Sequence, residues 1–296
     1  PRVALIWSSE PDKSQHDSGV GSDLAHTAIF EADREFGTLM AWIAETGRAA
    51  ETDVMVLSDH GYSTILGTIK IESLIREAGF LAGDEPGGVA VAANGGSVLF
   101  YIHQADSGTA EKLAVWLMQQ PWCGAITASE AVPNIKGTLP ASLVGTEGLR
   151  APDLAMSFRW DSNVNATGYP GYAFASGLSP GQGQHGSMSK HELKNVLFSW
   201  GPSFKSGVSL DTPSGNIDLA PTVLHLLGIT DGPAMDGRVL EESLAGGLDP
   251  SDVEWSSQLR STERIIENGV YRQQIAVSRV GETTYVDEGS GSFGPR

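Results

Sequence analysis

Acidic and imidazole side chains gather at three places in this 296-residue chain. The stretch "VMVLSDHGYS" runs from an apolar segment directly onto Asp59 and His60. Asp12 and His16 lie four residues apart in a polar stretch, and His185 lies in the glycine-rich stretch "GQGQHGSMS". Carboxylate oxygens and imidazole nitrogens are ligands of zinc and similar divalent ions. The three segments therefore predict a metal centre, provided that the fold brings them together.

The number of these ligands favours two metal ions over one. Five ligands exceed what a single catalytic zinc with an open position uses, and they are one short of two complete sites. Each motif by itself has a simpler structural explanation. An Asp at the end of a strand often caps a backbone amide, and polar loops commonly contain an Asp and a His. The combination of all three motifs carries the prediction.

The ligand segments must follow regular elements if they are to converge. Residues 2–8 form an apolar run that predicts a buried strand, and residues 22–46 have the apolar spacing of an amphipathic helix that ends at Gly47. Residues 53–58 predict a second buried strand. A strand, a helix and a strand in this order predict a βαβ unit of a parallel sheet. Ligands in such sheets bind beyond the carboxyl ends of the strands.

The rest of the chain predicts one domain with two additions. We expect a partial catalytic domain over residues 1–296, with an inserted α/β subdomain at about 76–150 and a β-rich C-terminal extension at about 241–296. Residues 161–190 are rich in Gly and Pro and predict a long loop, and residues 214–228 predict a helix. The extension is expected to begin with a surface helix and to end in a disordered tail, "EGSGSFGPR". The predicted fold class is α/β, with a mainly parallel central sheet flanked by helices.

Composition excludes several classes of function. A net charge of −17 makes nucleic acid unlikely to be the main partner, although metal ions can reverse the sign locally for a small anionic substrate. The single cysteine, Cys123, allows neither an internal disulfide nor a thiolate metal site. The chain contains no run of about 18 apolar residues, so no membrane span is predicted. The compartment stays open.

Four motifs in order resemble one enzyme family. "EPDKSQHDSGVGS", "VLSDHGY", "GQHGS" and "NIDLAPTVLHLLGI", spread over residues 1–240, are similar to the C-terminal portion of the type I phosphodiesterase/nucleotide pyrophosphatase family of the alkaline phosphatase superfamily. The resemblance implies an alkaline phosphatase-like three-layer sandwich. It also implies a hydrolase that cleaves phosphodiester, pyrophosphate or phosphomonoester bonds with two divalent metal ions.

The resemblance also implies roles for the five ligands. Asp12, His16 and His185 would bind one metal ion, and Asp59 and His60 the other. The family's Thr or Ser nucleophile and its sixth metal ligand match no residue here, so they are expected upstream of Pro1, and no catalytic or substrate-binding residue is assigned. Zinc is the default metal, although manganese, iron or calcium also accept oxygen and nitrogen ligands. The expected substrate is a small phosphorylated molecule such as a nucleotide, and an oligomer is possible.

Two alternatives remain open at this point. The nearest is hydrolysis of phosphonate or sulfate esters, which related members of the superfamily perform. The other is a truncated relative that binds a metal or a partner without turnover, which the unplaced nucleophile favours. The retention of all five ligands favours an enzyme.

Other residues near the motifs have mainly structural explanations. His26 is expected on the polar face of its helix, His191 at the surface, and His225 in a core or interface position on an apolar helix. Asp218 is expected either to make a hydrogen bond near the core or to lie in the first turn of a helix, where the helix dipole favours an acid. Four aromatic side chains of the long loop could stack on a nucleobase or simply pack the loop: Trp160, Tyr169, Tyr172 and Phe174.

Overall fold

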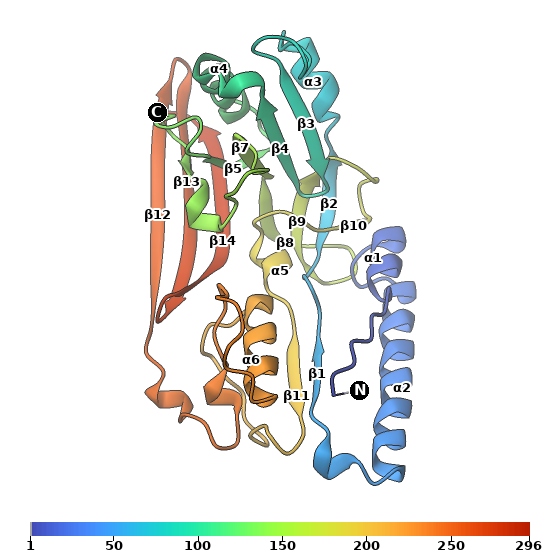
Figure 1. Ribbon diagram of the computed structural model, residues 1–296. Coiled ribbons are helices and arrows are strands. Elements are labelled where there is room, and N and C mark those ends of the chain that lie inside the picture. The colour runs from blue at the N-terminus through green and yellow to red at the C-terminus, as the bar shows by residue number, and fades with distance from the viewer. Residues whose placement is uncertain (1) are drawn as a thin grey trace.

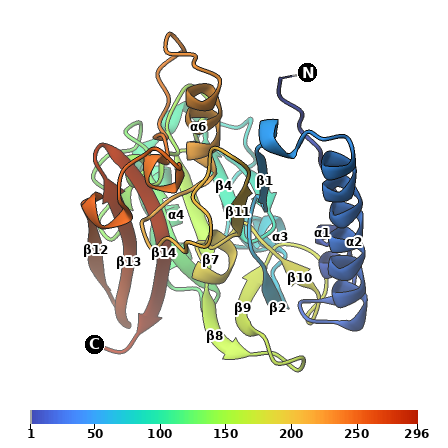
Figure 2. The same cartoon turned by 90° about the horizontal axis from the view of Figure 1, so that it is seen from below.

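The computed structural model describes residues 2–296 of the chain. The helices of the first fifty residues form one flank of the molecule, and the strands of the last forty form the opposite flank (Figures 1 and 2). A mixed α/β unit occupies one end in Figure 1. Within the described residues, none of the helices combines the length and the apolar character that crossing a membrane requires.

Two helices make up the N-terminal flank. α1 (Asp12–Ser18) carries the first ligand motif, and α2 (Asp23–Glu45) follows it after a short turn. The Ser22 side chain caps α2 by accepting a hydrogen bond from the Ala25 N–H at 3.2 Å, and Gly47 follows the helix with φ +72°. The predicted helix at 22–46 is therefore confirmed. Only a narrow stripe of α2 is buried, at Ala25, Ala28 and Ile43.

The apolar segment at residues 2–8 is not a strand, so this prediction is wrong. The segment has no regular structure, and Leu5 and Trp7 are 89% and 73% exposed. A strand needs a partner for its backbone hydrogen bonds, and β1 (Val54–Leu57) pairs instead with β11 (Leu197–Trp200). That pairing is antiparallel, so the predicted βαβ unit does not form in these residues.

The sheet beside the ligand motifs begins directly after the second motif. β2 (Ser63–Thr68) pairs in parallel with β9 (Pro170–Ala175) and antiparallel with β10 (Gly183–Gln184), while β9 pairs with β8 (Trp160–Val164). The prediction of a long loop at 161–190 is therefore wrong in part. β9 begins with Pro170 and Gly171, which are residue types that usually argue against a strand. The residues that follow them alternate between buried and partly buried positions, as a strand requires.

The α/β unit holds the largest hydrophobic core. Its elements are α3 (Ile71–Glu77), β3 (Val89–Asn94), β4 (Ser97–Ile102), α4 (Ser107–Met118), β5 (Cys123–Ala128), β6 (Leu139–Pro140) and β7 (Leu154–Phe158). The strands form one sheet in the order β3-β4-β7-β5-β6. Phe100, Leu117 and Met156 lie at its centre with no exposed surface. The limits of this unit as a subdomain stay a prediction.

The C-terminal flank is a three-stranded antiparallel sheet. Its strands are β12 (Trp255–Ile266), β13 (Gly269–Val280) and β14 (Thr283–Gly294). The predicted surface helix is absent from this part of the described chain, and the predicted disordered tail is wrong, because its residues form most of β14. A Cβ atom at Gly291 would lie 2.3 Å from the Gly124 carbonyl oxygen, so glycine here permits close packing. The Gly289 N–H of the same strand donates to the Met188 carbonyl at 2.8 Å.

Short helices complete the fold. α5 (Lys190–Leu193) lies in the middle of the molecule, and α6 (Leu219–Leu226) confirms the helix predicted at 214–228 (Figure 1). Single turns of 3₁₀ helix lie at Ala49–Glu51, His103–Ala105, Ala141–Val144, Asn216–Asp218, Glu241–Ser243 and Pro250–Asp252. Parallel pairing joins β2 to β9 and β5 to β6, and the other strand pairs described are antiparallel.

Candidate metal centre

The five predicted ligands come from three segments and meet around one carboxylate. The Asp12 Oδ1 atom lies 3.7 Å from the Nε2 of His16, 3.6 Å from that of His60 and 3.9 Å from that of His185. Asp59 joins the group through its Oδ1 atom, which lies 3.5 Å from His60 Nε2. The helix α1, the turn between β1 and β2, and the loop after β10 thus deliver their ligands to one place.

One part of this cluster has the composition of a single metal site. Asp12, His16 and His185 each offer one ligand atom, and these atoms all lie within 4.8 Å of one another. Two imidazoles with one carboxylate is a donor set that catalytic zinc sites use. His60 and Asp59 form a second pair, which shares Asp12 as its neighbour. The residues therefore fit one divalent ion well and supply two ligands toward a second.

Backbone carbonyls orient two of the rings. His16 Nδ1 lies 2.9 Å from the Gly183 oxygen, and His60 Nδ1 lies 3.0 Å from the Gly61 oxygen. A hydrogen bond at Nδ1 fixes the tautomer and leaves Nε2 as the free nitrogen. In both residues that free nitrogen faces Asp12.

The rings of His60 and His185 are stacked. Their centroids are 3.5 Å apart, with 12° between the ring planes. Burial, together with the neighbouring His60 and His16, lowers the pKa of His185 to about 4. Its ring is therefore neutral at pH 7, which is the form that coordinates a metal.

Tyr62 is a member of the centre that the sequence motifs did not predict. Its hydroxyl donates to the Asp12 carboxylate and lies 3.0 Å from the Asp12 carbonyl oxygen. Its ring meets the rings of His16, His60 and His185 edge-on, at centroid distances of 5.3, 5.4 and 5.5 Å. Burial and the hydrogen bond to Asp12 raise its pKa, so the hydroxyl keeps its proton. The only sequence signal is its place directly after the Asp-His-Gly motif.

Two amide side chains hold the turn that carries Asp59. Asn195 Nδ2 donates to the Ser58 carbonyl at 2.8 Å, and Asn216 Nδ2 donates to the Asp59 carbonyl at 3.0 Å. Both donors come from segments far along the chain. Asn216 begins the fourth sequence motif, but nothing in the local sequence of either residue marks it as a partner of this turn.

The remaining histidines near the motifs lie outside the cluster. His26 is exposed on α2, as predicted, and its Nε2 lies 2.9 Å from the Tyr169 hydroxyl. His191 is partly buried, with its Nε2 2.9 Å from the Ser162 hydroxyl. His225 is exposed on α6, so a core position is wrong.

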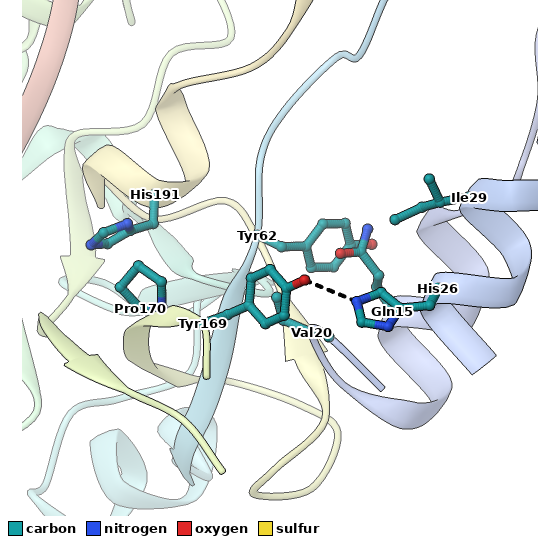
Figure 3. Close-up of a pocket in the computed structure, with 9 residues that line it drawn as sticks. Gln15, Val20, His26, Ile29, Tyr62, Tyr169, Pro170 and His191 are labelled. Carbon is teal, nitrogen blue, oxygen red and sulfur yellow. Dashed lines mark hydrogen bonds between the residues drawn. The ribbon is translucent and has the colours of Figure 1, made fainter. Parts of the chain in front are cut away.

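A pocket of about 240 Å³, whose lining residues are drawn in Figure 3, adjoins the cluster through Tyr62. Tyr62 belongs to both, because its hydroxyl contacts Asp12 while its side chain also lines the pocket. The pocket is lined by Gln15, Val20, Gly21, His26, Ile29, Tyr62, Tyr169, Pro170 and His191, and none of these is an Asp, Glu, Lys or Arg. Of the four aromatic residues considered for stacking, Tyr169 lines this pocket, and Trp160 and Phe174 line a second hollow of about 200 Å³.

The chain belongs to the type I phosphodiesterase / nucleotide pyrophosphatase family, whose model matches residues 1–188. The matched region contains all five predicted ligands, and the family predicted from the four motifs is confirmed. A comparison with curated proteins finds no match.

Solved structures with a similar fold include ectonucleotide pyrophosphatase / phosphodiesterase 5 (ENPP5) from mouse and human. Each is 16% identical to this chain over 80% of its residues, with TM-scores of 0.55 and 0.56. An inactive variant of the murine protein in complex with AMP is 17% identical over 76% of this chain and 53% of that one, with a TM-score of 0.54. The likeness confirms the predicted alkaline phosphatase-like α/β fold. The chain spans 57% of the length of the first two structures.

Proposed function

We propose that this protein is a metal-dependent hydrolase of phosphodiester or pyrophosphate bonds. The observation that carries the proposal is the convergence of His16, His60 and His185 on one oxygen of Asp12, in a chain of the type I phosphodiesterase family. Three segments separated by many residues supply these side chains. A surface loop with an incidental Asp–His pair would not gather ligands in this way.

In this proposal, Asp12, His16 and His185 bind one divalent ion, and Asp59 and His60 bind a second. When bound, such ions polarise a phosphoryl oxygen and lower the pKa of a hydroxyl nucleophile. Zinc suits the oxygen and nitrogen ligands best, and manganese is an alternative. The nucleophile is not assigned to a residue of this chain.

The substrate that we propose is a small phosphorylated molecule of the nucleotide type. Tyr62, Tyr169 and His26 give the pocket beside the cluster an aromatic, mostly apolar lining that suits an uncharged ring. The complex of the murine relative with AMP supports this choice. The net charge of −17 argues against a long polyanion as the substrate.

Hydrolysis of chromogenic esters tests this function. The protein, extended upstream of Pro1 so that it includes the expected nucleophile, is purified and assayed with bis(4-nitrophenyl) phosphate, 4-nitrophenyl phosphate and 4-nitrophenyl sulfate, in Zn²⁺ or Mn²⁺ and in EDTA. We expect metal-dependent cleavage of the diester, and a loss of more than about 100-fold in Asp12→Ala and His185→Ala, because direct ligands matter more than the residues that orient them. His225→Ala is the matched control, because this histidine is exposed and outside the cluster.

Other outcomes would replace the proposal. Cleavage of the sulfate ester alone would assign the chain to sulfate ester hydrolysis. Tight metal binding without cleavage of any ester would make the chain a binding protein rather than an enzyme. If the protein neither binds metal nor cleaves any ester, that result would contradict the metal centre itself.

A further inference from the structure

Glu192 is a buried carboxylate that the proposed chemistry does not use. It belongs to the short helix α5, and only 3% of its surface is exposed. A buried carboxylate is costly unless hydrogen bonds satisfy it, so its partners indicate why it is there. The partners of the carboxylate belong to the segment that carries His185, and the backbone carbonyl of the same residue binds the segment that carries His60.

The side chain of Glu192 holds the loop that carries His185. Its Oε2 atom accepts the Ser187 backbone N–H at 2.6 Å, and its Oε1 atom accepts the Ser187 hydroxyl at 2.7 Å. Ser187 is two residues beyond His185. The carboxylate therefore fixes both the backbone and the side chain of this loop next to the ligand.

The backbone of Glu192 holds the turn that carries His60. The Gly61 N–H donates to the Glu192 carbonyl oxygen at 2.6 Å. A Cβ atom at Gly61 would lie 2.3 Å from the His191 oxygen and 2.6 Å from the Lys194 oxygen. The glycine of the Asp-His-Gly motif thus lets this turn pack directly against the backbone of α5.

We propose that Glu192 is a positioning residue for the metal centre: it clamps the His60 turn and the His185 loop to one another. With its carbonyl on one segment and its carboxylate on the other, it sets the separation of the two stacked rings. This role rests on the proposed function only in that His60 and His185 are metal ligands. It predicts that Glu192 changes the geometry of metal binding beyond its effect on stability.

Glu192→Gln tests the role with almost no change of volume. The two groups of Ser187 that face the side chain include the backbone N–H, which can only donate. A carboxylate accepts from both groups with charge assistance, whereas an amide accepts from the N–H with its oxygen and donates its NH₂ to the hydroxyl, so both bonds lose their charge assistance. The variant therefore weakens the clamp and leaves the packing of α5 in place. Ser187→Ala, which removes the hydroxyl alone, should have a smaller effect of the same kind.

Two readouts report on the clamp without any assay of activity. The first is a titration with Co²⁺, followed by the visible absorption of the bound ion, which depends on ligand geometry. The second is a ¹H–¹⁵N correlation spectrum of the imidazole rings in the metal-free protein, in which His26, His103 and His225 serve as internal references. We expect Glu192→Gln to lower the Co²⁺ affinity by about 10- to 100-fold, to change the absorption bands and to shift the His60 and His185 resonances.

Glu242→Gln is the matched control for a purely structural effect. Glu242 is also buried, at 1% exposed, and also makes two hydrogen bonds, but both go to Arg238 and none to a ligand segment. We expect this variant to lower the melting temperature and to leave the Co²⁺ spectrum and the ring resonances as in the wild type. Glu254→Gln, at an exposed position, controls for the lost charge.

The results separate this inference from the proposed function. Wild-type affinity, absorption bands and ring resonances in Glu192→Gln would overturn the clamp and leave the metal centre intact. The clamp would also be overturned if Glu192→Gln and Glu242→Gln lowered the melting temperature equally and the Co²⁺ affinity fell no further in Glu192→Gln than in Glu242→Gln. Absence of Co²⁺ binding in the wild type would remove the proposed metal centre, while unchanged ring resonances in metal-free Glu192→Gln would refute the clamp by itself.

Discussion

Asp12 is the residue on which the candidate centre depends most. Three imidazole nitrogens lie between 3.6 and 3.9 Å from one of its oxygens, and Tyr62 donates to its carboxylate. A carboxylate that faces three imidazoles at once must be held in one rotamer if all three are to keep it as a neighbour. Tyr62 supplies this restraint, because its ring is packed among the histidines and its hydroxyl has little freedom.

Removal of the Tyr62 hydroxyl should therefore weaken metal binding. We expect Tyr62→Phe to lower the Zn²⁺ affinity by about 10-fold or more, measured by isothermal titration calorimetry, while the ring still fills its site. Tyr169→Phe is the control, because it loses a hydrogen bond to His26 but does not touch Asp12. Equal affinities in the two variants would show that Asp12 needs no such partner.

At the scale of elements, the turn after β1 depends on a residue without a side chain. Any Cβ atom at Gly61 would overlap the backbone of α5. We expect Gly61→Ala to lower the free energy of unfolding by about 1–3 kcal/mol, in the range for overpacked sites, and to weaken metal binding as well. Urea denaturation measures the first effect. Gly246→Ala, where a Cβ atom would meet no atom within 4 Å, should be close to neutral, and a neutral Gly61→Ala would contradict the close packing.

The long helix α2 allows the prediction of one substitution that raises the stability of the protein and one that lowers it. Gly37 lies inside it with open space around the position of a Cβ atom, so Gly37→Ala should stabilise the protein by about 1 kcal/mol. Ser22→Ala removes the cap and should destabilise it by about 1 kcal/mol. Thermal unfolding of both variants checks the signs. A loss of stability in Gly37→Ala would mean that the helix is not exposed there.

Elements with local signals could be predicted from the sequence, and elements that need distant partners could not. The helix at 22–46 has its own cap and apolar spacing, and the hairpin of β3 and β4 has its Asn-Gly-Gly turn. The segment at 2–8 is as apolar as a strand but finds no partner in the described chain. The glycine-rich residues of β14 form a strand because β13 pairs with them.

The candidate site divides in the same way. The five predicted ligands belong to short motifs, and the Asp and His residues of these motifs predict a metal site. Tyr62, Glu192, Asn195 and Asn216 act through contacts made only in the folded chain. Tyr62 and Asn216 lie within the quoted motifs, but all four residue types are common, and nothing in the sequence predicts the contacts that they make.

At the scale of the whole molecule, a buried network joins α6 to the C-terminal sheet. Asp218 is fully buried and accepts hydrogen bonds from the Arg238 N–H at 2.8 Å and from the Tyr285 hydroxyl at 3.0 Å. The Arg238 guanidinium pairs in turn with Glu242. Both positions considered for Asp218 are therefore what the structure shows, because it makes hydrogen bonds in the core and lies in the first turn of the Asn216–Asp218 helix.

This network predicts a loss of stability in acid. Burial would raise the pKa of Glu242, but its hydrogen bonds to Arg238 and to its own backbone, together with the positive charges of Arg238 and Lys205, outweigh burial and hold the pKa below its ordinary value of 4.5. The ion pair therefore stabilises the fold fully above that pH, and the contribution is lost as the pH falls through the lower, folded-state pKa. Glu242→Gln should be less stable at pH 7 by about 3 kcal/mol and should lose less stability on acidification. Thermal unfolding between pH 7 and pH 3 measures both, and parallel curves for the two proteins would contradict the assignment.

The contact between β14 and the loop after His185 has a consequence for how the protein is made. The Gly289 N–H bonds to Met188, three residues beyond a ligand, yet it lies about a hundred residues later in the chain. Because translation runs from the N-terminus, the ribosome releases all five ligands before the strand that supports one of them. A nascent chain that stalls before Gly289 holds every ligand and lacks this support. We therefore expect tight metal capture to follow the synthesis of β14 and its docking against Met188.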